Sequence, residues 1–432
     1  MTLDCNKMFL ESDRKQQSRV ISLFKPTAPV GALFFFAHFK LRSTPLLRNF
    51  HPPRGLTFRA LLCYNTETER NKRETLTSMN QIQLLEQKSK RNRILLTVMA
   101  FLVLVVAVAC LFAGSSNMTF RGCLDALLGC GSAAHSRIIW KIRVPRVLAA
   151  LIAGAGLAVS GLVMQTTLNN AMASPSTLGV SNAAVFGANL SIIAFAGGFL
   201  STGNNLNAFD VGANPYATSL LAFLFSAASV LLILGLCTVR SFSPNVVVLS
   251  GMAIGSVWTA ATTVLQFYAT DVGLSAAVVW SFGDLGRATY RTDLIMLAVT
   301  VCGTVFFSLM AWKYNALLSG EATAKTMGIH VELLRFVTLL LASLITAACV
   351  SFLGVIGFVG IICPHVTKKL MGQDHRITIP FSALSGSLLL LLADTFSRSL
   401  GNGSALPVGA ITSLLGAPFF IAIIFSKKGG HK

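Results

Sequence analysis

Long runs of apolar residues alternate along this chain with short polar or basic stretches. Residues 94–113 read ILLTVMAFLVLVVAVACLFA and include no charged side chain. About 20 apolar residues, rising 1.5 Å each in a helix, cross the hydrocarbon core of a bilayer. Runs of this kind recur to the end of the chain, which is more apolar surface than a soluble core can bury. The pattern predicts an all-α polytopic membrane protein.

Hydropathy and the Gly, Pro and polar residues that interrupt it predict about ten transmembrane helices. We expect them at residues 94–114, 145–168, 178–200, 216–239, 246–269, 294–312, 334–352, 358–371, 379–400 and 407–425. The eighth is too short to cross a bilayer alone, so we expect it to be tilted, broken or extended by its flanks.

Residues 1–85 differ from the rest of the chain. They mix basic and polar residues with apolar patches such as residues 32–37 (ALFFFA), which are too short to span a membrane. They lack the order of a secretory signal. Their composition favours a disordered extension, or a start codon assigned too far upstream of Met79, over a working domain. Residues 86–432 form one transmembrane domain in this interpretation.

The distribution of charge argues for a membrane rather than for nucleic acid. Hydrophobic residues make up 53% of the chain and charged residues 12%, although the net charge is +19. Residues 1–93 carry 17 Lys and Arg against 7 Asp and Glu, and the other basic residues divide among short loops. Lys and Arg hold such loops on the cytoplasmic side. We therefore expect both termini in the cytoplasm and no nucleic-acid partner.

Five basic residues oppose this bias. Arg137, Lys141, Arg143 and Arg146 crowd the predicted outer end of the second helix, and Arg398 lies at the outer end of the ninth. Charge-assisted hydrogen bonds to the carboxylates of an acidic docking partner would explain them. Snorkelling of the side chains to lipid phosphates would explain them equally well. Position alone does not choose between the two.

Asp394 is an ionisable residue inside a predicted transmembrane helix. Such a carboxylate is a functional candidate by default. A single carboxylate is a poor basis for a proton relay, so we favour a structural role as the partner of a neighbouring Arg or backbone group. The nine cysteines have no metal-ligand spacing, and no metal site is predicted. Cys123 and Cys130 share a predicted outer loop, where they are either bridged or free.

Residues 317–335 (LLSGEATAKTMGIHVELLR) form a polar insert between the sixth and seventh predicted helices. A short helix along the cytoplasmic surface fits this composition, and so does an ordinary amphipathic linker. The chain contains no GxxxxGK[ST] phosphate loop, so it is not predicted to be an enzyme or to bind a cofactor. Any ATP would be bound and hydrolysed by a separate protein.

Several short motifs occur in the order seen in the FecCD/BtuC-type permease family of ABC importers for iron-siderophores, haem and cobalamin. The chain resembles this family from about residue 91 to residue 428. The motifs are IRVPR at 142–146, PSTLGVS at 175–181, LSGMAIGS at 249–256, WSFG at 280–283, GEA at 320–322, GVIGFVGIICPHVTKKLMGQDHR at 354–376, LLLADTFSR at 390–398 and LPVGAITSLLGAPFF at 406–420. Two departures are NAMA at 170–173, where the family usually has Asn-Pro-Leu-Ala, and Ala405, where it usually has an acidic residue.

The resemblance implies a ten-helix, BtuC-like permease subunit in the bacterial inner (cytoplasmic) membrane. It implies a second copy of the permease around a central path, two cytoplasmic ABC ATPases and a periplasmic or lipoprotein receptor that delivers the ligand. Selectivity rests mostly with the receptor, so the sequence does not distinguish among a siderophore, haem and cobalamin. It also leaves open whether the dimer is a homodimer or a heterodimer.

The resemblance assigns functions to three groups of residues. Those that dock the receptor's acidic residues are Arg143, Arg146 and Arg398. Those that couple to the ATPase are Gly320, Glu321, Ala322 and Gly328. Those of the cytoplasmic gate, between the fourth and fifth helices, are Ser243, Pro244 and Asn245.

Two rival functions come from other classes. An ion-coupled secondary transporter would need several intramembrane carboxylates and broken helices in matching halves, and the carboxylates are scarce here. A proton- or quinone-handling subunit of a respiratory complex would need buried Lys, Glu and His along a midplane axis, and His365 is too isolated to supply one.

Overall fold

The computed structural model describes residues 86–113, 120–195, 214–239, 242–400 and 406–426. The extension predicted at residues 1–85 lies outside these ranges. Within them, seven helices are long and apolar enough to cross a membrane, and shorter apolar helices accompany them. The chain is an all-α polytopic membrane protein, as the hydropathy pattern predicts.

Each of the ten predicted segments contains a helix. The helix that precedes the labelled ones is Glu86–Phe112, called here the first helix. The others are α4 (Phe120–Leu127), α5 (Ala133–Ile138), a π-helical turn η2 (Ile139–Arg143), α6 (Val144–Thr167), η3 (Pro175–Leu178), α7 (Val180–Asn189), η4 (Leu190–Phe195), α8 (Pro215–Val239), α9 (Pro244–Phe267), α10 (Asp271–Ser281), η6 (Leu285–Arg287), α11 (Tyr290–Leu309), α12 (Ala311–Leu318), α13 (Glu321–Thr326), α14 (Val331–Leu353), α15 (Val359–Met371), α16 (His375–Leu400) and α17 (Val408–Ser426). The hydropathy pattern did not predict α10.

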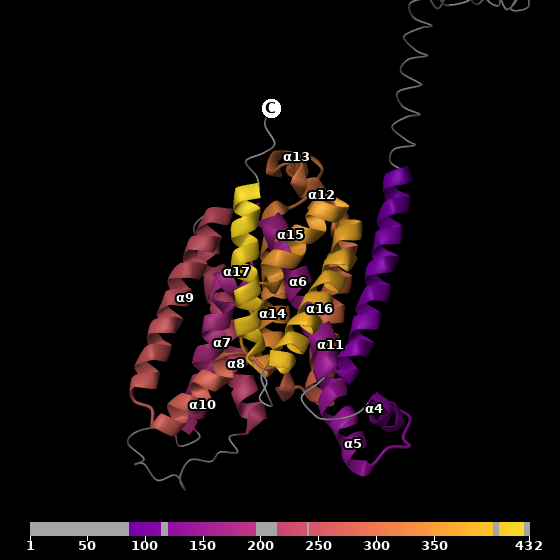
Figure 1. Cartoon of the computed structure of the whole chain (residues 1–432). Helices are drawn as coiled ribbons and strands as arrows, with labels where there is room; N and C mark the ends of the chain where they lie inside the picture. Colours follow the sequence, from indigo (N-terminus) through magenta and orange to yellow (C-terminus); the bar gives the residue numbers. More distant parts are fainter. Residues whose placement is uncertain (1–85, 114–119, 196–213, 240–241, 401–405, 427–432) are drawn as a thin grey trace, which may run out of the picture. The chain divides into compact units, whose positions relative to one another are not determined.

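Helix α6 forms the centre of the bundle, packed against α11, α14, α15 and α16 (Figure 1). Glycines in α6 make this packing close. A Cβ atom added to Gly161 would lie 1.9 Å from the carbonyl oxygen of Gly360 in α15, and one added to Gly154 would lie 2.4 Å from that of Gly386 in α16. Small residues let helix backbones approach in this way inside a membrane, where van der Waals packing holds helices together.

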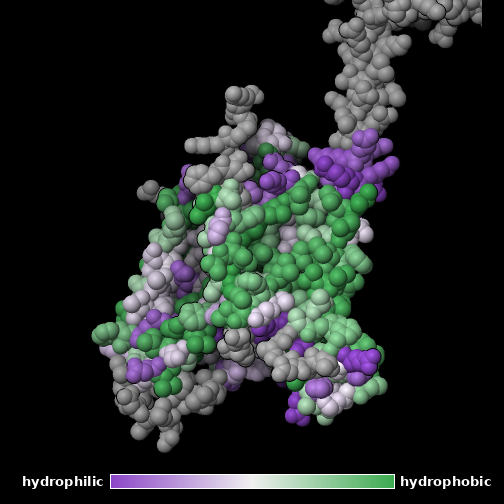
Figure 2. All heavy atoms as spheres, in the orientation of Figure 1, coloured by the Kyte–Doolittle hydropathy of each residue, from purple (hydrophilic) through white to green (hydrophobic). Residues whose placement is uncertain are grey.

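The outer surface of the bundle is apolar across its middle. Figure 2 shows a continuous hydrophobic region on the face viewed, with hydrophilic residues gathered toward the two ends. The first helix contributes exposed large side chains such as Phe101 and Leu104 to this surface, and α11 contributes Leu294 and Val305. Lipid tails can cover such a surface without cost, which is why apolar side chains remain outside a transmembrane bundle.

The bundle has two distinct ends. Helices α12 and α13 lie at one, called here the α13 end, whereas α4, α5 and α10 lie at the other, called the α5 end (Figure 1). The first helix begins at the α13 end and α17 finishes there.

The eighth predicted segment, α15, is short because the chain ahead of it is not helical. Residues 354–357 have no regular structure, and Phe358, at a φ of +65°, precedes the first residue of the helix. This irregular stretch is packed against other backbone, since a Cβ atom on Gly354 would lie 2.6 Å from the carbonyl oxygen of Trp280. Non-helical backbone is tolerated at membrane depth when protein buries it. The sequence predicts that the eighth segment is tilted, broken or extended by its flanks, and in the structure it is a short helix preceded by non-helical backbone.

Candidate functional site

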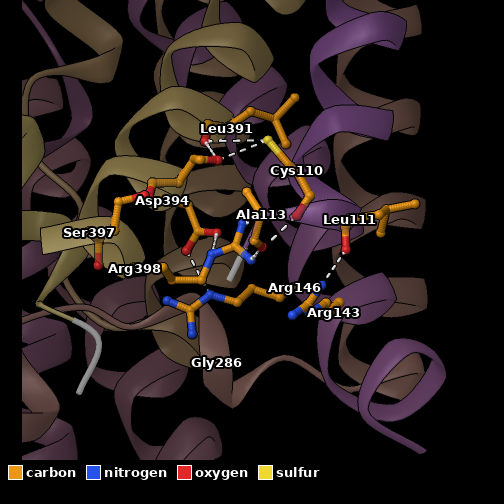
Figure 3. Close-up of polar contacts among 12 residues, drawn as sticks. Cys110, Leu111, Ala113, Arg143, Arg146, Gly286, Leu391, Asp394, Ser397 and Arg398 are labelled. Atoms are coloured by element: carbon orange, nitrogen blue, oxygen red, sulfur yellow. Dashed lines mark hydrogen bonds and ion pairs between the residues drawn. The ribbon is translucent and has the colours of Figure 1, made fainter. Parts of the chain in front are cut away.

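Two of the three arginines assigned to docking, Arg146 and Arg398, contact one buried carboxylate at the α5 end, and the third, Arg143, contacts Leu111 of the first helix beside them (Figure 3). Asp394, in the last turns of α16, is 1% exposed. Its Oδ1 accepts a hydrogen bond of 2.7 Å from Nε of Arg146, at the start of α6. Its Oδ2 lies 3.0 Å from Nε of Arg398, one helical turn further along α16. The prediction that Asp394 is the structural partner of a neighbouring Arg is confirmed.

The same cluster caps the C-terminal end of the first helix. Arg143 donates from Nη1 to the carbonyl oxygen of Leu111 at 2.7 Å, and Arg398 donates from Nη1 to that of Ala113 at 2.7 Å. The last carbonyl groups of a helix have no partner within it, and the helix dipole favours cations there. These contacts explain why basic residues gather where the first helix, α6 and α16 meet.

The guanidinium groups of the cluster are engaged inside the subunit. Arg143 is 4% exposed and Arg146 is 8% exposed. The cluster reaches the surface through Asp284, which is partly exposed and lies 3.5 Å from Nη2 of Arg146. Arg137 and Lys141, the other basic residues of this end, are exposed. Docking by Arg143, Arg146 and Arg398 stays a prediction, because these contacts are all within one chain.

The residues assigned to ATPase coupling lie at the α13 end. Gly320 precedes α13 with a φ of +109°, and Gly328 follows it with a φ of +79°. These are backbone conformations that glycine adopts most readily. Glu321, Ala322 and Gly328 are exposed, whereas Ala324 is fully buried. The expected short helix at the surface is present, and a Cβ atom on Gly320 or Gly328 would meet no other atom within 4 Å.

The residues assigned to the gate form an ordinary helix start at the N-terminus of α9. Ser243 caps the helix, with its Oγ accepting a hydrogen bond of 3.4 Å from the backbone N–H of Val246. Pro244 occupies the first turn, where its missing N–H costs nothing. Asn245 is exposed.

Arg335 connects these two groups, and its role could not be inferred from the sequence. It is the last residue of the polar insert at residues 317–335, and it is 2% exposed within α14. Its Nη2 forms an ion pair with Glu321 Oε1, its Nη1 donates to the carbonyl oxygen of Phe242, and its Nε donates to that of Thr167 at 3.2 Å. Glu321 is only 14 positions from Arg335, and an ion pair between two charged residues of one short polar segment is too common to indicate a special role. Nothing in the local sequence indicates the other two.

Cys123 is buried beside Arg143, Cys130 is exposed, and both are free thiols. The structure thus favours the free form over the disulfide for this pair. Among the described residues, no group of three or more His, Cys, Asp or Glu side chains is arranged to hold a metal ion.

Comparisons with known proteins agree with this architecture. The model of the FecCD transport family matches residues 102–426. A protein of Methanocaldococcus jannaschii named as an ABC transporter permease is 44% identical over 77% of this chain and 93% of its own length. The hemin transport system permease of Yersinia pestis is 32% identical over 78% of this chain and 96% of its own.

A solved structure described as an inward-facing conformation of an ABC transporter of the metal-chelate type superimposes with a TM-score of 0.66. It covers 77% of this chain and 99% of its own, at 26% sequence identity. The family match spans most of the helical bundle, from the first helix to α17, and the chain belongs to the FecCD transport family.

Proposed function

We propose that this chain is the membrane-spanning subunit of an ATP-driven importer that carries an iron chelate, haem or cobalamin into the cytoplasm. The observation that carries the proposal is the family match across the bundle. Relatives named for hemin, vitamin B12 and iron(3+)-hydroxamate transport support this group of ligands. These ligands are large chelates that a receptor selects, so the permease needs a path of suitable width rather than a tight binding site.

In this proposal the α13 end faces the cytoplasm and the α5 end faces the receptor. The first helix begins and α17 finishes at the α13 end, so these two ends of the bundle lie on one side of the membrane, and we propose that this side is cytoplasmic. Two copies of the chain would enclose the path in the inner membrane. Each would receive one ATPase on α13 and its flanking residues Gly320 and Gly328, and each would close the path with residues 243–245.

The proposed function is tested by reconstitution. The purified chain, its ATPase and its receptor are placed in proteoliposomes with ATP inside, and uptake of a radiolabelled ferric siderophore, haem and cobalamin is measured. We expect uptake of one of the three to require both ATP and the receptor. ADP in place of ATP should give no uptake. Uptake that follows an ion gradient and ignores ATP would instead indicate a secondary transporter.

We also propose that receptor docking involves Arg143, Arg146 and Arg398. Acidic groups of a receptor could displace the partly exposed Asp284 from Arg146, or compete with Asp394 for the guanidinium groups. Salt screens the long-range attraction between an acidic receptor and this basic end of the subunit, so receptor affinity should fall as ionic strength rises. A single Arg→Lys change keeps the positive charge but loses the planar set of guanidinium donors. We therefore expect each change to weaken receptor binding severalfold, measured on immobilised transporter in nanodiscs.

The exposed basic residues of the same end supply the control for this docking experiment. The variant with both Arg137→Gln and Lys141→Gln removes two charges outside the cluster and should bind the receptor nearly as the wild type does. If this control loses affinity while the Arg→Lys variants keep it, docking belongs to the exposed residues and not to the buried cluster. Thermal unfolding of each variant shows whether the fold is intact.

A further inference from the structure

We infer that Glu321 and Arg335 form a positioning pair that links α13 to the segment ahead of α9, so that movement of α13 is passed to the gate residues. The inference rests on the proposed function, which assigns α13 to the ATPase and residues 243–245 to the gate. Neither the hydropathy pattern nor the family motifs connect Arg335 to either group.

The geometry suits the transfer of a displacement. A guanidinium group is rigid and planar, with donors that point in fixed directions. In Arg335 the three nitrogen atoms contact three separate elements: Glu321 on α13, the carbonyl oxygen of Thr167 at the end of α6, and the carbonyl oxygen of Phe242. Because Phe242 is joined directly to Ser243, the residue that caps α9, Arg335 holds the backbone from which the gate helix begins.

The three contacts of Arg335 differ in how exposed they are, and this difference determines which of them an outside partner can move. The side chain of Glu321 is half-exposed on the surface helix, whereas that of Arg335 is 3% exposed. Thr167 is buried and ends the central helix α6. The ring of Phe242 packs against that of Phe336, next to Arg335, with 6.1 Å between the centroids. The exposed carboxylate can therefore be moved from outside, while α6 supplies a fixed point inside the bundle.

Electrostatics makes Arg335 follow Glu321. A buried guanidinium group that loses its carboxylate keeps a charge in a medium of low dielectric constant, which is strongly unfavourable. If an ATPase displaces α13, Arg335 can keep its partner by moving with it, and its bonds to Phe242 and Thr167 must then stretch or shift. The backbone at Phe242 is the less restrained end of this connection, since α6 packs against α11, α14, α15 and α16 at the centre of the bundle, whereas Phe242 lies outside the regular helices, ahead of α9. The start of α9 is therefore the part that should move.

The experiment measures coupling in the reconstituted transporter, as uptake per ATP hydrolysed. Glu321→Ala removes the carboxylate that accepts from Arg335, and Arg335→Lys removes the planar guanidinium group. Glu321→Gln keeps an acceptor oxygen at the same place. The matched control is Glu332→Ala, in the same polar insert. The side chain of Glu332 is 72% exposed, and its Oε1 lies 3.9 Å from Nζ of Lys325. Hydrogen bonds to charged groups are strong enough that uptake per ATP should fall about tenfold in Glu321→Ala and Arg335→Lys. Glu321→Gln keeps an acceptor oxygen but loses the charge that holds Arg335, so it should recover only part of the uptake. Glu332→Ala should resemble the wild type.

A second readout follows the gate itself. Asn245→Cys, in a chain whose exposed cysteines are replaced by serine, is labelled with a membrane-impermeant maleimide in inside-out vesicles. We expect ATP to change the labelling rate in the otherwise wild-type chain and in Glu332→Ala, but not in Glu321→Ala. A simple loss of stability would not remove the ATP dependence of labelling while leaving the site reactive.

The outcomes separate the two proposals. A wild-type transporter that couples normally, together with a Glu321→Ala variant that matches Glu332→Ala in both readouts, would overturn the positioning pair and leave the proposed function intact. A wild-type transporter without ATP-dependent uptake would overturn the proposed function, and this inference with it.

Discussion

Substitution of Asp394 by Asn is expected to lower the free energy of unfolding by about 3–5 kcal/mol, the usual cost of removing one partner from a buried ion pair. Asp394 is 1% exposed and contacts both Arg146 and Arg398. Asn has almost the same shape, so the change removes charge without opening a cavity. Two guanidinium groups would then face each other without the anion between them, and the contact of α16 with α6 and the first helix would weaken.

Unfolding of the purified chain by a denaturing detergent, followed by circular dichroism, measures this loss. The matched control is Asp284→Asn, since Asp284 also lies near Arg146 but is 42% exposed and 3.5 Å away. Exposed pairs contribute below about 1 kcal/mol, so this control should differ little from the wild type. Equal effects from the two variants would show that burial of Asp394 does not determine its contribution. The double variant Asp394→Asn with Arg398→Gln should recover part of the loss, because it removes one uncompensated cation.

Substitution of Gly161 by Ala is expected to be the most damaging single-methyl change in the bundle. The added Cβ would lie 1.9 Å from the carbonyl oxygen of Gly360 and 2.6 Å from its Cα. These are backbone atoms of α15, which cannot rotate away as a side chain can. Helices α6 and α15 would have to separate, and overpacking of this kind costs about 1–3 kcal/mol or more.

Gly235→Ala supplies the control for Gly161→Ala, because a Cβ atom on Gly235 in α8 would meet no other atom within 4 Å. Alanine favours helix by up to about 1 kcal/mol over glycine, so this change should be neutral or slightly stabilising. Folded yield in detergent and the temperature of unfolding measure both variants. A Gly161→Ala chain as stable as Gly235→Ala would mean that α6 and α15 lie farther apart than the structure has them.

The basic residues at the α5 end show how a structure can change the interpretation of a charge pattern. Position alone left receptor docking and lipid phosphates as equal explanations for them. Arg143 and Arg398 instead reach carbonyl oxygens at the end of the first helix, and Arg146 reaches Asp394. These internal contacts account for the burial of the three residues, and any docking role must act together with them. Arg137 and Lys141, by contrast, keep exposed side chains.

The sequence by itself determined the class of the protein, the positions of its helices and its family resemblance. Each of these depends on local information: a run of apolar residues must be helical inside a bilayer, because its backbone polar groups have no water to bind. The hydropathy pattern did not predict the cap of α9 at Ser243 or the glycine turns on either side of α13, which the structure shows. It missed α10, whose 11 residues are too few for a hydropathy window that detects spanning helices.

Only the tertiary structure decided which polar groups meet. Arg146 and Asp394 are 248 positions apart, and Arg335 is 168 positions from Thr167 and 93 from Phe242. Such contacts depend on which faces of α6, α14 and α16 turn toward one another, and side-chain packing over the whole bundle sets those faces. An apolar helix has almost the same hydropathy on every side, so its sequence carries little information about its rotation. A buried guanidinium group must nevertheless find acceptors, and the fold places them where three distant segments converge.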